Sequence, residues 1–248
     1  MDKKVVLVTG SSQGLGKVIA KRLAAEGCFV VVNCHSNVER AQAVVDEIKA
    51  AGGDGAAYVC DISNPDAIVK MFAELNELYG GVDVLVNNAR VDPMSRRPEE
   101  SEAEWWDKNI AVKLRAPYLC GLEFFKYAEP KGWGRIINVS SARAHYPAEP
   151  SMVAYTVGNL GLHALTRSFA LRGAPHGITA NTLAPGMIAT ENLQKRIIPE
   201  RYELEMSMIP LRRAGTCDEV ADGVIFALHN GYITGETINI NGGMTYAP

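Results

Sequence analysis

Short runs of β-branched and other apolar residues alternate along the chain with longer stretches whose apolar positions recur at helical spacing. The apolar runs predict strands at residues 5–8, 29–32, 82–86, 135–139, 178–183 and 237–240, with a further strand that ends at 58–60. The amphipathic stretches predict helices at 15–26, 38–51 and 67–79. Because the runs are apolar throughout rather than alternating, helices should cover both faces of a parallel sheet.

This order of elements predicts an α/β protein with a doubly wound parallel sheet, the Rossmann fold, as a single domain over residues 1–248. Such sheets bind their ligands at the carboxyl ends of the strands. Residues 187–210 form a long stretch without a predicted strand, and we expect them to make a substrate lid over that site.

The composition is that of an ordinary globular protein, with 47% hydrophobic and 21% charged residues. A formal net charge of −3 gives no reason to expect nucleic acid or an anionic membrane as a partner. The five cysteines are odd in number and include no CxxC pair, which favours free thiols in a reducing compartment. Because no signal-peptide core, transmembrane run or metal-binding motif is present, we expect a soluble cytoplasmic protein without a metal.

A glycine-rich turn follows the first predicted strand directly and leads into the first predicted helix. Glycines allow a tight turn and a close approach of the backbone to a pyrophosphate, and the helix start presents free N–H groups to it. The strand–turn–helix context therefore predicts a dinucleotide-binding site. Its candidate residues are Gly10, Ser12, Gln13, Gly14, Leu15 and Gly16.

The spacing Gly10-x-x-x-Gly14-x-Gly16 resembles the glycine motif of the short-chain dehydrogenase/reductase family. The resemblance spans nearly the whole chain and is closest in pattern to reductases of the 3-oxoacyl-carrier-protein type. It implies a nicotinamide cofactor and a homotetramer or homodimer. The further matching positions are Asp61 and Ile62 near the adenine, Asn88 and Ala89 after the fourth strand, Ser141 and Tyr155, and Pro185, Gly186, Ile188 and Thr190 near the nicotinamide.

The end of the second strand bears on which nicotinamide cofactor is bound. An acidic residue there would bind the ribose 2′-hydroxyl of NAD and repel the 2′-phosphate of NADP. This chain has Cys34 at that position, followed by His35 and Ser36, with Arg40 nearby, and these side chains can donate hydrogen bonds to a phosphate. The pattern favours NADP over NAD. It stays open because Gln13 stands where many NADP-preferring relatives carry a basic residue, and because the polar residues could simply form a solvated turn.

The resemblance also implies catalytic roles, and two of the four positions depart from the family. Ser141 would hold the substrate oxygen and Tyr155 would pass a proton, with a Lys that lowers the pKa of the Tyr by favouring phenolate. The expected Lys is Asn159, and the expected Asn is, by register, Lys113. In one interpretation the two have exchanged roles, so that Lys113 supplies the charge and Asn159 supplies a neutral hydrogen bond. In the family the lysine also binds the nicotinamide ribose, so Tyr155 and Asn159 count among the candidate cofactor-binding residues as well. In the other, Lys113 extends to solvent and ordinary redox power is lost; Asn109 is a further candidate for the polar role.

Two arginines fall beside the expected substrate space. Arg90 replaces the glycine of the family's NNAG motif, and Arg143 follows Ser141 by two positions. Because Arg pairs with carboxylate or phosphate, they suggest an anionic substrate or intermediate. The alternative is that both are surface arginines paired with acidic residues. Tyr146 and Met187 are further candidates for substrate contact.

The leading expectation is an NADP-dependent oxidoreductase that transfers a hydride between the cofactor and a carbonyl or alcohol substrate. Because function depends on the site rather than on the fold, two alternatives stay open. One is atypical or non-redox chemistry on the same scaffold, such as elimination, hydrolysis or oxidative cleavage. The other is a non-catalytic protein that binds the dinucleotide.

Overall fold

A parallel sheet forms the centre of the molecule, as the hydrophobic pattern predicts. The computed structural model describes residues 3–93, 95–191, 193 and 198–245. Within these residues, seven strands pair in parallel in the order β3-β2-β1-β4-β5-β6-β7. The strands are β1 (Val5–Val8), β2 (Phe29–Cys34), β3 (Asp54–Val59), β4 (Val84–Asn87), β5 (Gly134–Val139), β6 (Ile178–Pro185) and β7 (Thr237–Ile240).

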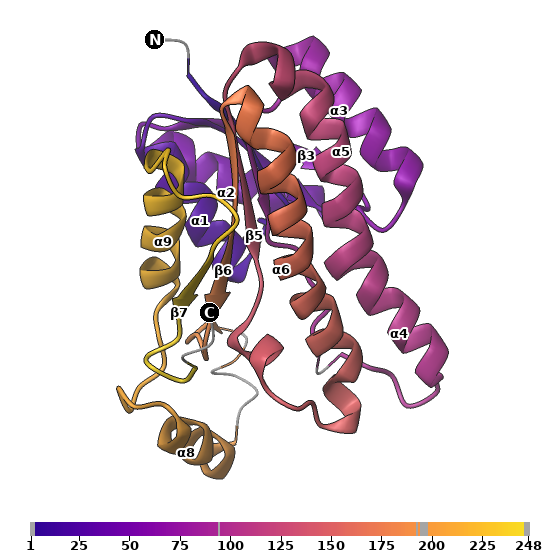
Figure 1. The fold of residues 1–248 in the computed structure, drawn as a ribbon, viewed down its shortest axis with the longest axis vertical. Coiled ribbons are helices and arrows are strands. Elements are labelled where there is room, and N and C mark those ends of the chain that lie inside the picture. The colour runs from indigo at the N-terminus through magenta and orange to yellow at the C-terminus, as the bar shows by residue number, and fades with distance from the viewer. Residues whose placement is uncertain (1–2, 94, 192, 194–197, 246–248) are drawn as a thin grey trace.

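Helices cover both faces of the sheet (Figure 1). One face carries α1 (Gly14–Ala25), α2 (Val38–Ala50) and α9 (Cys217–His229), and the other carries α3 (Pro65–Tyr79), α5 (Ala116–Ala128) and α6 (Val153–Gly173). The helix α4 (Glu102–Ile110) runs into α5 through a π-helical turn at Ala111–Arg115. The helix α8 (Pro199–Met208) lies beyond the carboxyl ends of β6 and β7.

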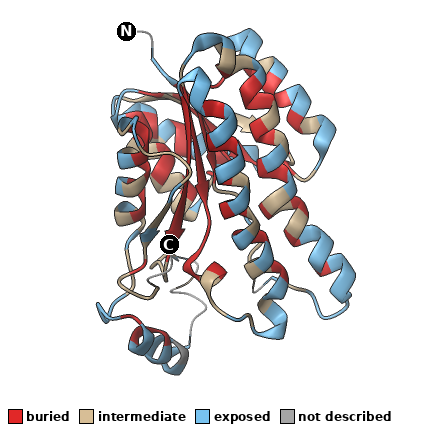
Figure 2. Cartoon of the chain, in the orientation of Figure 1, coloured by how far each residue is buried: buried red, intermediate tan, exposed pale blue. Residues whose placement is uncertain are grey.

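The continuous apolar runs are explained by two cores, one on each side of the sheet. In β1, Val6 and Val8 pack toward α1, α2 and α9, whereas Val5 and Leu7 belong to the core beneath α3, α5 and α6. The central strands are therefore buried throughout, while the outer faces of the helices are exposed (Figure 2). Burial on both faces is what a doubly wound sheet requires of its strands.

The strand order reverses between β1 and β4, because β2 and β3 lie on one side of β1 while β5, β6 and β7 lie beyond β4. The loops that leave the carboxyl ends of β1 and β4 therefore diverge and open a crevice, which is the usual ligand site of this architecture. The predicted lid contains α8 and a short bridge between Ile188 and Gly215. Positions 192 and 194–197 of that prediction lie outside the described residues.

Candidate functional site

A cleft of about 1670 Å³ opens at the carboxyl ends of the central strands. Every predicted cofactor-binding residue except Asn159 lines it. The cleft also brings together Ser141, Tyr155, Lys113 and the substrate candidates Arg90, Arg143 and Met187. Residues that are far apart in the sequence thus meet in one cavity, whereas Asn109, Tyr146 and Asn159 are not among its lining residues.

The glycine turn between β1 and α1 is packed against the segment after β4. Gly10 and Gly14 have φ angles of +62° and +55°, in the left-handed region that favours glycine. A Cβ atom at Gly16 would lie 2.5 Å from Asn88 Nδ2 and 2.6 Å from the carbonyl oxygen of Gly10. The Asn88 side chain donates to the carbonyl oxygens of Thr9 and Gly10 at 2.9 and 3.2 Å. Asn88 therefore stabilises the conformation of the glycine turn through these two hydrogen bonds.

The start of α1 is open toward the cleft. Gln13 is its N-cap residue, and no side chain of the described chain hydrogen-bonds in the cap. The first N–H groups of the helix are therefore left for a ligand, and the helix dipole favours an anion there. This geometry suits the diphosphate that the sequence predicts at this position.

Asn33 is a site residue that sequence reasoning missed. Its side chain is buried, and its Oδ1 accepts a hydrogen bond from the Gly10 N–H at 3.1 Å. Its Nδ2 lies 3.3, 3.3 and 3.2 Å from the carbonyl oxygens of Cys34, Tyr58 and Cys60. One amide thus ties the glycine turn to the ends of β2 and β3. The sequence did contain a signal for this contact, because Asn33 is a polar residue at the end of an apolar strand. A buried amide needs hydrogen-bond partners, so a structural role could have been expected.

Arg40 lies beside the glycine turn, which the sequence alone did not indicate. Its Nη1 donates to Oε1 of Gln13 at 2.8 Å. Burial raises the pKa of the neighbouring Cys34 thiol, so this position carries no negative charge near neutral pH. The end of β2 and the first turn of α2 therefore offer a neutral thiol and a cation where an acidic residue would select NAD.

Asp61, at the far end of the cleft, is held as a carboxylate. Burial opposes its ionisation, but hydrogen bonds from Ser63 together with the nearby His35 outweigh that effect and lower the pKa of Asp61. The Ser63 N–H donates at 2.9 Å, and His35 Nε2 lies 3.3 Å from the carboxylate. An ionised carboxylate accepts hydrogen bonds only, which suits an amino group on a ligand.

Ser141 and Tyr155 reach the cleft from the loop after β5 and from the first turn of α6. Ser141 Oγ accepts a hydrogen bond from the Arg143 N–H at 3.2 Å. A hydroxyl that accepts this bond can still donate its own proton, here toward an oxygen in the cleft. The pair therefore presents two hydroxyl groups to one cavity.

Lys113 lies in the π-helical turn and is only 3% exposed. It does not extend to solvent, and its Nζ instead donates to the carbonyl oxygen of Val139 at 2.5 Å. No carboxylate among the described residues pairs with it. Burial, followed by the charge of Arg90, lowers the pKa of Lys113 to about 7. Near neutral pH the amine is therefore divided between its charged and neutral forms.

Gly158 and Asn159 on α6 are fitted to Lys113. A Cβ atom at Gly158 would lie 3.2 and 3.3 Å from Cβ and Cγ of Lys113, so the glycine leaves room for the lysine stem. Asn159 is fully buried, and its Nδ2 donates to the carbonyl oxygen of Tyr155 at 2.8 Å. Its Oδ1 is buried without a hydrogen-bond partner in the described part of the chain.

The two arginines of the cleft differ in their surroundings. Arg143 Nη2 lies 2.6 Å from Oε1 of Glu205 on α8, whose side chain is 7% exposed. Arg143 is therefore neutralised within the protein, and sequence reasoning missed Glu205 because it lies 62 positions further along. Arg90 is exposed and lines the cleft, and no acidic residue in the described part of the chain forms an ion pair with it.

Two other candidates turn away from the cleft. The Tyr146 hydroxyl donates to the carbonyl oxygen of Met244, so it ties its loop to the carboxyl-terminal segment. The Asn109 side chain donates to the carbonyl oxygen of Trp105 at 2.8 Å inside the helix. Neither side chain lines the cavity, whereas Met187 and Met244 do.

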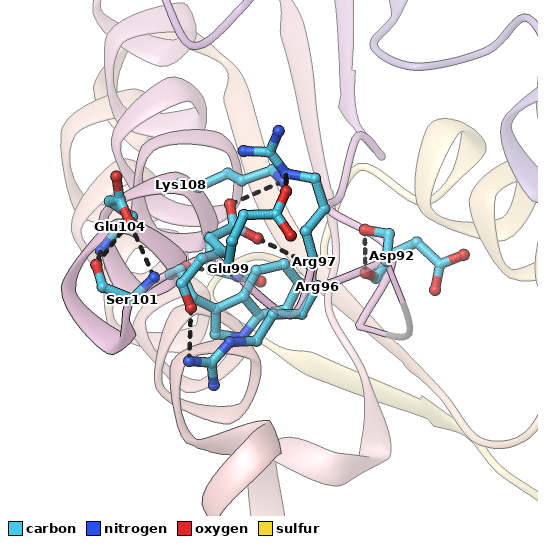
Figure 3. A network of polar contacts seen from close by, with 11 residues as sticks. Asp92, Arg96, Arg97, Glu99, Ser101, Glu104 and Lys108 are labelled. Carbon is cyan, nitrogen blue, oxygen red and sulfur yellow. Dashed lines mark hydrogen bonds and ion pairs between the residues drawn. The ribbon is translucent and has the colours of Figure 1, made fainter.

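A network of charged residues holds the segment between β4 and α4, which borders the cleft (Figure 3). Ser101 and Glu104 form a capping box at the start of α4. Lys108 Nζ lies 3.2 Å from the carboxylate of Glu100, which is almost completely buried. These contacts fix the start of α4, and α4 continues into the turn that carries Lys113.

The fold and the cleft define a Rossmann protein with a dinucleotide cradle, and comparison with known proteins gives the family. The model of the short chain dehydrogenase family matches residues 4–200. The chain is 37% identical to a 3-oxoacyl-[acyl-carrier-protein] reductase FabG of Staphylococcus aureus, over 97% of this chain and 98% of that one. It is 32% identical to glucose 1-dehydrogenase 2 of Bacillus subtilis, over 99% and 96%.

A solved structure agrees with these relatives. The structure of a putative gluconate dehydrogenase from Agrobacterium tumefaciens superimposes with a TM-score of 0.90 at 33% identity, over 99% of this chain and 97% of that chain. The protein belongs to the short-chain dehydrogenase family, which confirms the resemblance seen in the sequence.

Replacing Lys113 with Met should change the pH dependence of stability. Because the folded-state pKa lies near 7 and the usual value is 10.5, the unfolded chain binds more protons between these values, and wild-type stability rises with pH across that window. Lys113→Met removes this term. Its free energy of unfolding relative to wild type should therefore be most favourable below pH 7, and this advantage should fall by on the order of 5 kcal/mol across the window.

Denaturant unfolding at several pH values measures this difference. The control is Lys126→Met, which removes a lysine whose side chain is 56% exposed and which pairs with Glu123. Its difference from wild type should be small and nearly constant with pH. A Lys113→Met curve parallel to the wild-type curve would show that Lys113 keeps an ordinary pKa.

Proposed function

We propose that the protein is an NADP-dependent oxidoreductase that transfers a hydride between the nicotinamide and a carbonyl or alcohol substrate. The observation that carries the proposal is the convergence of four features on one cleft: the open start of α1, Ser141, Tyr155 and Lys113. The relatives named as a reductase and as dehydrogenases are oxidoreductases by name, which supports the same reaction class.

The cleft fits a dinucleotide. Gly10, Gly14 and Gly16 line the cleft without side chains, so a ligand can approach the backbone, and α1 offers uncapped N–H groups there. The glycine turn would hold the diphosphate, Asp61 the adenine end, and the segment from Pro185 to Thr190 the nicotinamide end. When bound, the nicotinamide would supply or accept the hydride.

Preference for NADP is supported by the end of β2. Gln13 holds the guanidinium of Arg40 at the glycine turn. Arg40 therefore brings a positive charge to the position where many NADP-preferring relatives carry a basic residue in the turn itself. His35 and Ser36 also line the cleft beside the neutral Cys34. A 2′-phosphate would gain a charge-assisted hydrogen bond here and meet no carboxylate on β2.

The reaction at the carbonyl needs an oxygen-binding group and a proton donor. Ser141 would donate a hydrogen bond to the substrate oxygen, and the Tyr155 phenol would give it a proton as the hydride arrives. Loss of that proton leaves a phenolate, which a nearby cation favours. Lys113, whose stem packs against Gly158 on the helix of Tyr155, would provide this charge, while Asn159 holds the backbone of Tyr155.

The charge of Lys113 sets the expected pH range. Because its pKa is near 7, the ammonium form predominates below that pH and is lost above it. Carbonyl reduction consumes a proton and uses the ammonium, so reduction should be fastest on the acidic side of that value.

An anionic substrate is supported by Arg90. Its side chain is exposed at the cleft without an ion pair in the described ranges, whereas Arg143 already faces Glu205. Arg90 therefore has donors left for a carboxylate or phosphate of the substrate.

A cytoplasmic location and a homo-oligomeric state are part of the same proposal. Across the described ranges, every helix is too short or too polar to cross a membrane. The five cysteines all lie in the described chain and are free thiols, which suits a cytoplasmic location. Leu171 and Phe226 are large apolar side chains with 82% and 51% exposure, which suits a homotetramer or homodimer.

The proposed reaction is tested by following NADPH absorbance with a panel of aldehydes and keto acids. We expect turnover in wild type, with a rate that falls above about pH 7. Tyr155→Phe and Lys113→Met should each lower kcat by about 10²–10⁴-fold with little change in NADPH affinity, because they remove a proton donor and the charge that assists it. Lys126→Met is the matched control and should keep wild-type rates.

The same assay separates the alternatives. Tight NADPH binding without oxidation would favour a non-catalytic binding protein. Product formation without net change in NADPH would favour non-redox chemistry. A Lys113→Met variant with wild-type turnover and pH profile would show that Lys113 does not supply the charge that assists Tyr155.

Cofactor preference is tested at Arg40. Arg40→Ala should raise the KM for NADPH by about 10–100-fold, the loss of a hydrogen bond to a charged group, and change the KM for NADH little. Steady-state kinetics with both cofactors measures this ratio. Arg172→Ala removes an arginine that instead pairs with Glu129, and it should alter neither value. An equal effect of Arg40→Ala on both cofactors would exclude a contact with the 2′-phosphate.

Substrate charge is tested at Arg90 with keto acids and their methyl esters, which differ in charge at nearly the same shape. Arg90→Gln should raise KM for an active keto acid by about tenfold or more while the ester changes little, since only the acid pairs with the guanidinium. The ratio of the two kcat/KM values is the readout. If the variant treats acid and ester as wild type does, Arg90 does not recognise the anion.

A further inference from the structure

A second polar cluster begins at Ser140, which lines the cleft beside Ser141, and extends away from the cleft to His163. The Ser140 hydroxyl lies 3.0 Å from the carbonyl oxygen of Asn159 and 2.9 Å from His163 Nε2. The other ring nitrogen of His163, Nδ1, lies 3.4 Å from Oγ1 of Thr237 on β7. Ser140, Asn159 and His163 are all buried, and the ring of His145 packs edge-on against that of His163 at 5.0 Å. Neither histidine lines the cleft.

The direction of these hydrogen bonds follows from their chemistry. The carbonyl oxygen of Asn159 can only accept, so the single hydroxyl proton of Ser140 points to it. The Ser140 oxygen must then accept from His163, which places the ring proton on Nε2. Nδ1 is left to accept from the Thr237 hydroxyl. The opposite arrangement would bring two acceptors to 3.0 Å without a proton between them.

His163 stays neutral through the working range, which keeps this direction fixed. Burial, with the charges of His145 and Arg167, lowers the pKa of His163 to about 4. Its Nε2 proton is therefore committed to Ser140 and is unavailable for acid–base chemistry in the cleft. The histidine acts through its neighbours and not on a substrate.

Ser140 and Asn159 are linked directly to Ser141 and Tyr155, whose hydroxyl groups line the cleft. Ser140 directly precedes Ser141, and its own N–H donates to the carbonyl oxygen of Leu183 at 2.7 Å. Asn159 lies one turn after Tyr155 on α6 and donates from its side chain to the Tyr155 carbonyl oxygen. The Ser140 hydroxyl thus joins the loop of Ser141 to the helix of Tyr155.

We propose that His163 is a positioning residue that, through Ser140, fixes the distance between Ser141 and Tyr155. This rests on the proposed function, in which both hydroxyl groups act on one substrate oxygen. Without the Nε2 donor, the Ser140 hydroxyl is free to turn away from Asn159, and the serine loop loses its tie to α6. A misplacement of about 1 Å at reacting groups is enough to cost about 100-fold in rate.

The test compares His163→Leu with His163→Gln. Leucine removes the donor, whereas the amide nitrogen of glutamine can reach Ser140 as Nε2 does. We expect His163→Leu to lower kcat by about tenfold or more with an unchanged KM for NADPH, and His163→Gln to recover most of that loss. Ser140→Ala should match His163→Leu, and adding His163→Leu to it should cause no further loss in kcat, because both act through one chain of bonds.

Thr166→Val is the matched control. Thr166 lies one turn further along α6, is buried, and bonds to Asn138 at 2.8 Å and to Thr182 at 2.6 Å, away from the serine loop. It should lose stability as His163→Leu does and keep the wild-type kcat. A kcat loss of equal size in Thr166→Val and His163→Leu, or His163→Gln no better than leucine, would make the role merely structural and overturn the proposal.

A readout without turnover separates this proposal from the proposed function. In NMR spectra of the apoprotein, nitrogen shifts should show His163 as the neutral Nε2–H form at neutral pH. The amide signals of Ser141 and Tyr155 should move in His163→Leu and stay in place in Thr166→Val. If they stay in place in both, the positioning role is wrong even where wild type is active. If they move and no carbonyl substrate is reduced, the proposed function fails and the positioning of the two hydroxyl groups stands.

Discussion

The proposed chemistry of this site depends on the burial of Lys113, which has no carboxylate partner within the described residues. A buried ammonium loses its hydration, and one hydrogen bond to the Val139 carbonyl replaces only part of it. The protein therefore holds an amine whose proton is released near neutral pH. An ordinary surface lysine would stay charged at this pH, so the burial of Lys113 is what gives the proposed reaction its pH range.

The surroundings of Lys113 are adapted to it on several elements. The π-helical turn adds a residue per turn between α4 and α5, and it is this turn that carries the lysine. Gly158 leaves space for the stem, and Asn159, shorter than the expected lysine, is fully enclosed in α6. A side chain at position 158 would crowd the stem of Lys113, so the lysine and the glycine are matched in size.

Most of the fold was predictable from the sequence, because apolar runs and a glycine turn are local signals. The predicted strand at 5–8 and the doubly wound order are confirmed, and the family motifs placed Ser141 and Tyr155. What failed depended on side chains that meet only after folding. Glu205 is far from Arg143 in sequence, Asn33 joins three strand ends, and no periodicity marks such contacts. Tyr146 was expected at the substrate, yet its hydroxyl is taken by Met244, since the direction of a loop side chain is set by tertiary packing.

The cost of Lys113 also bears on whether the protein is an enzyme or only binds a dinucleotide. A binding protein needs the glycine turn, Asn88 and the open start of α1, none of which involves Lys113. It gains nothing from a buried amine with a lowered pKa, and perturbed groups in a cleft are found most often where a reaction uses them. Stability alone would favour an apolar residue at position 113. A destabilising lysine that lines the same cleft as two hydroxyl groups is therefore best explained by catalysis, with proton transfer as the step that would need its charge.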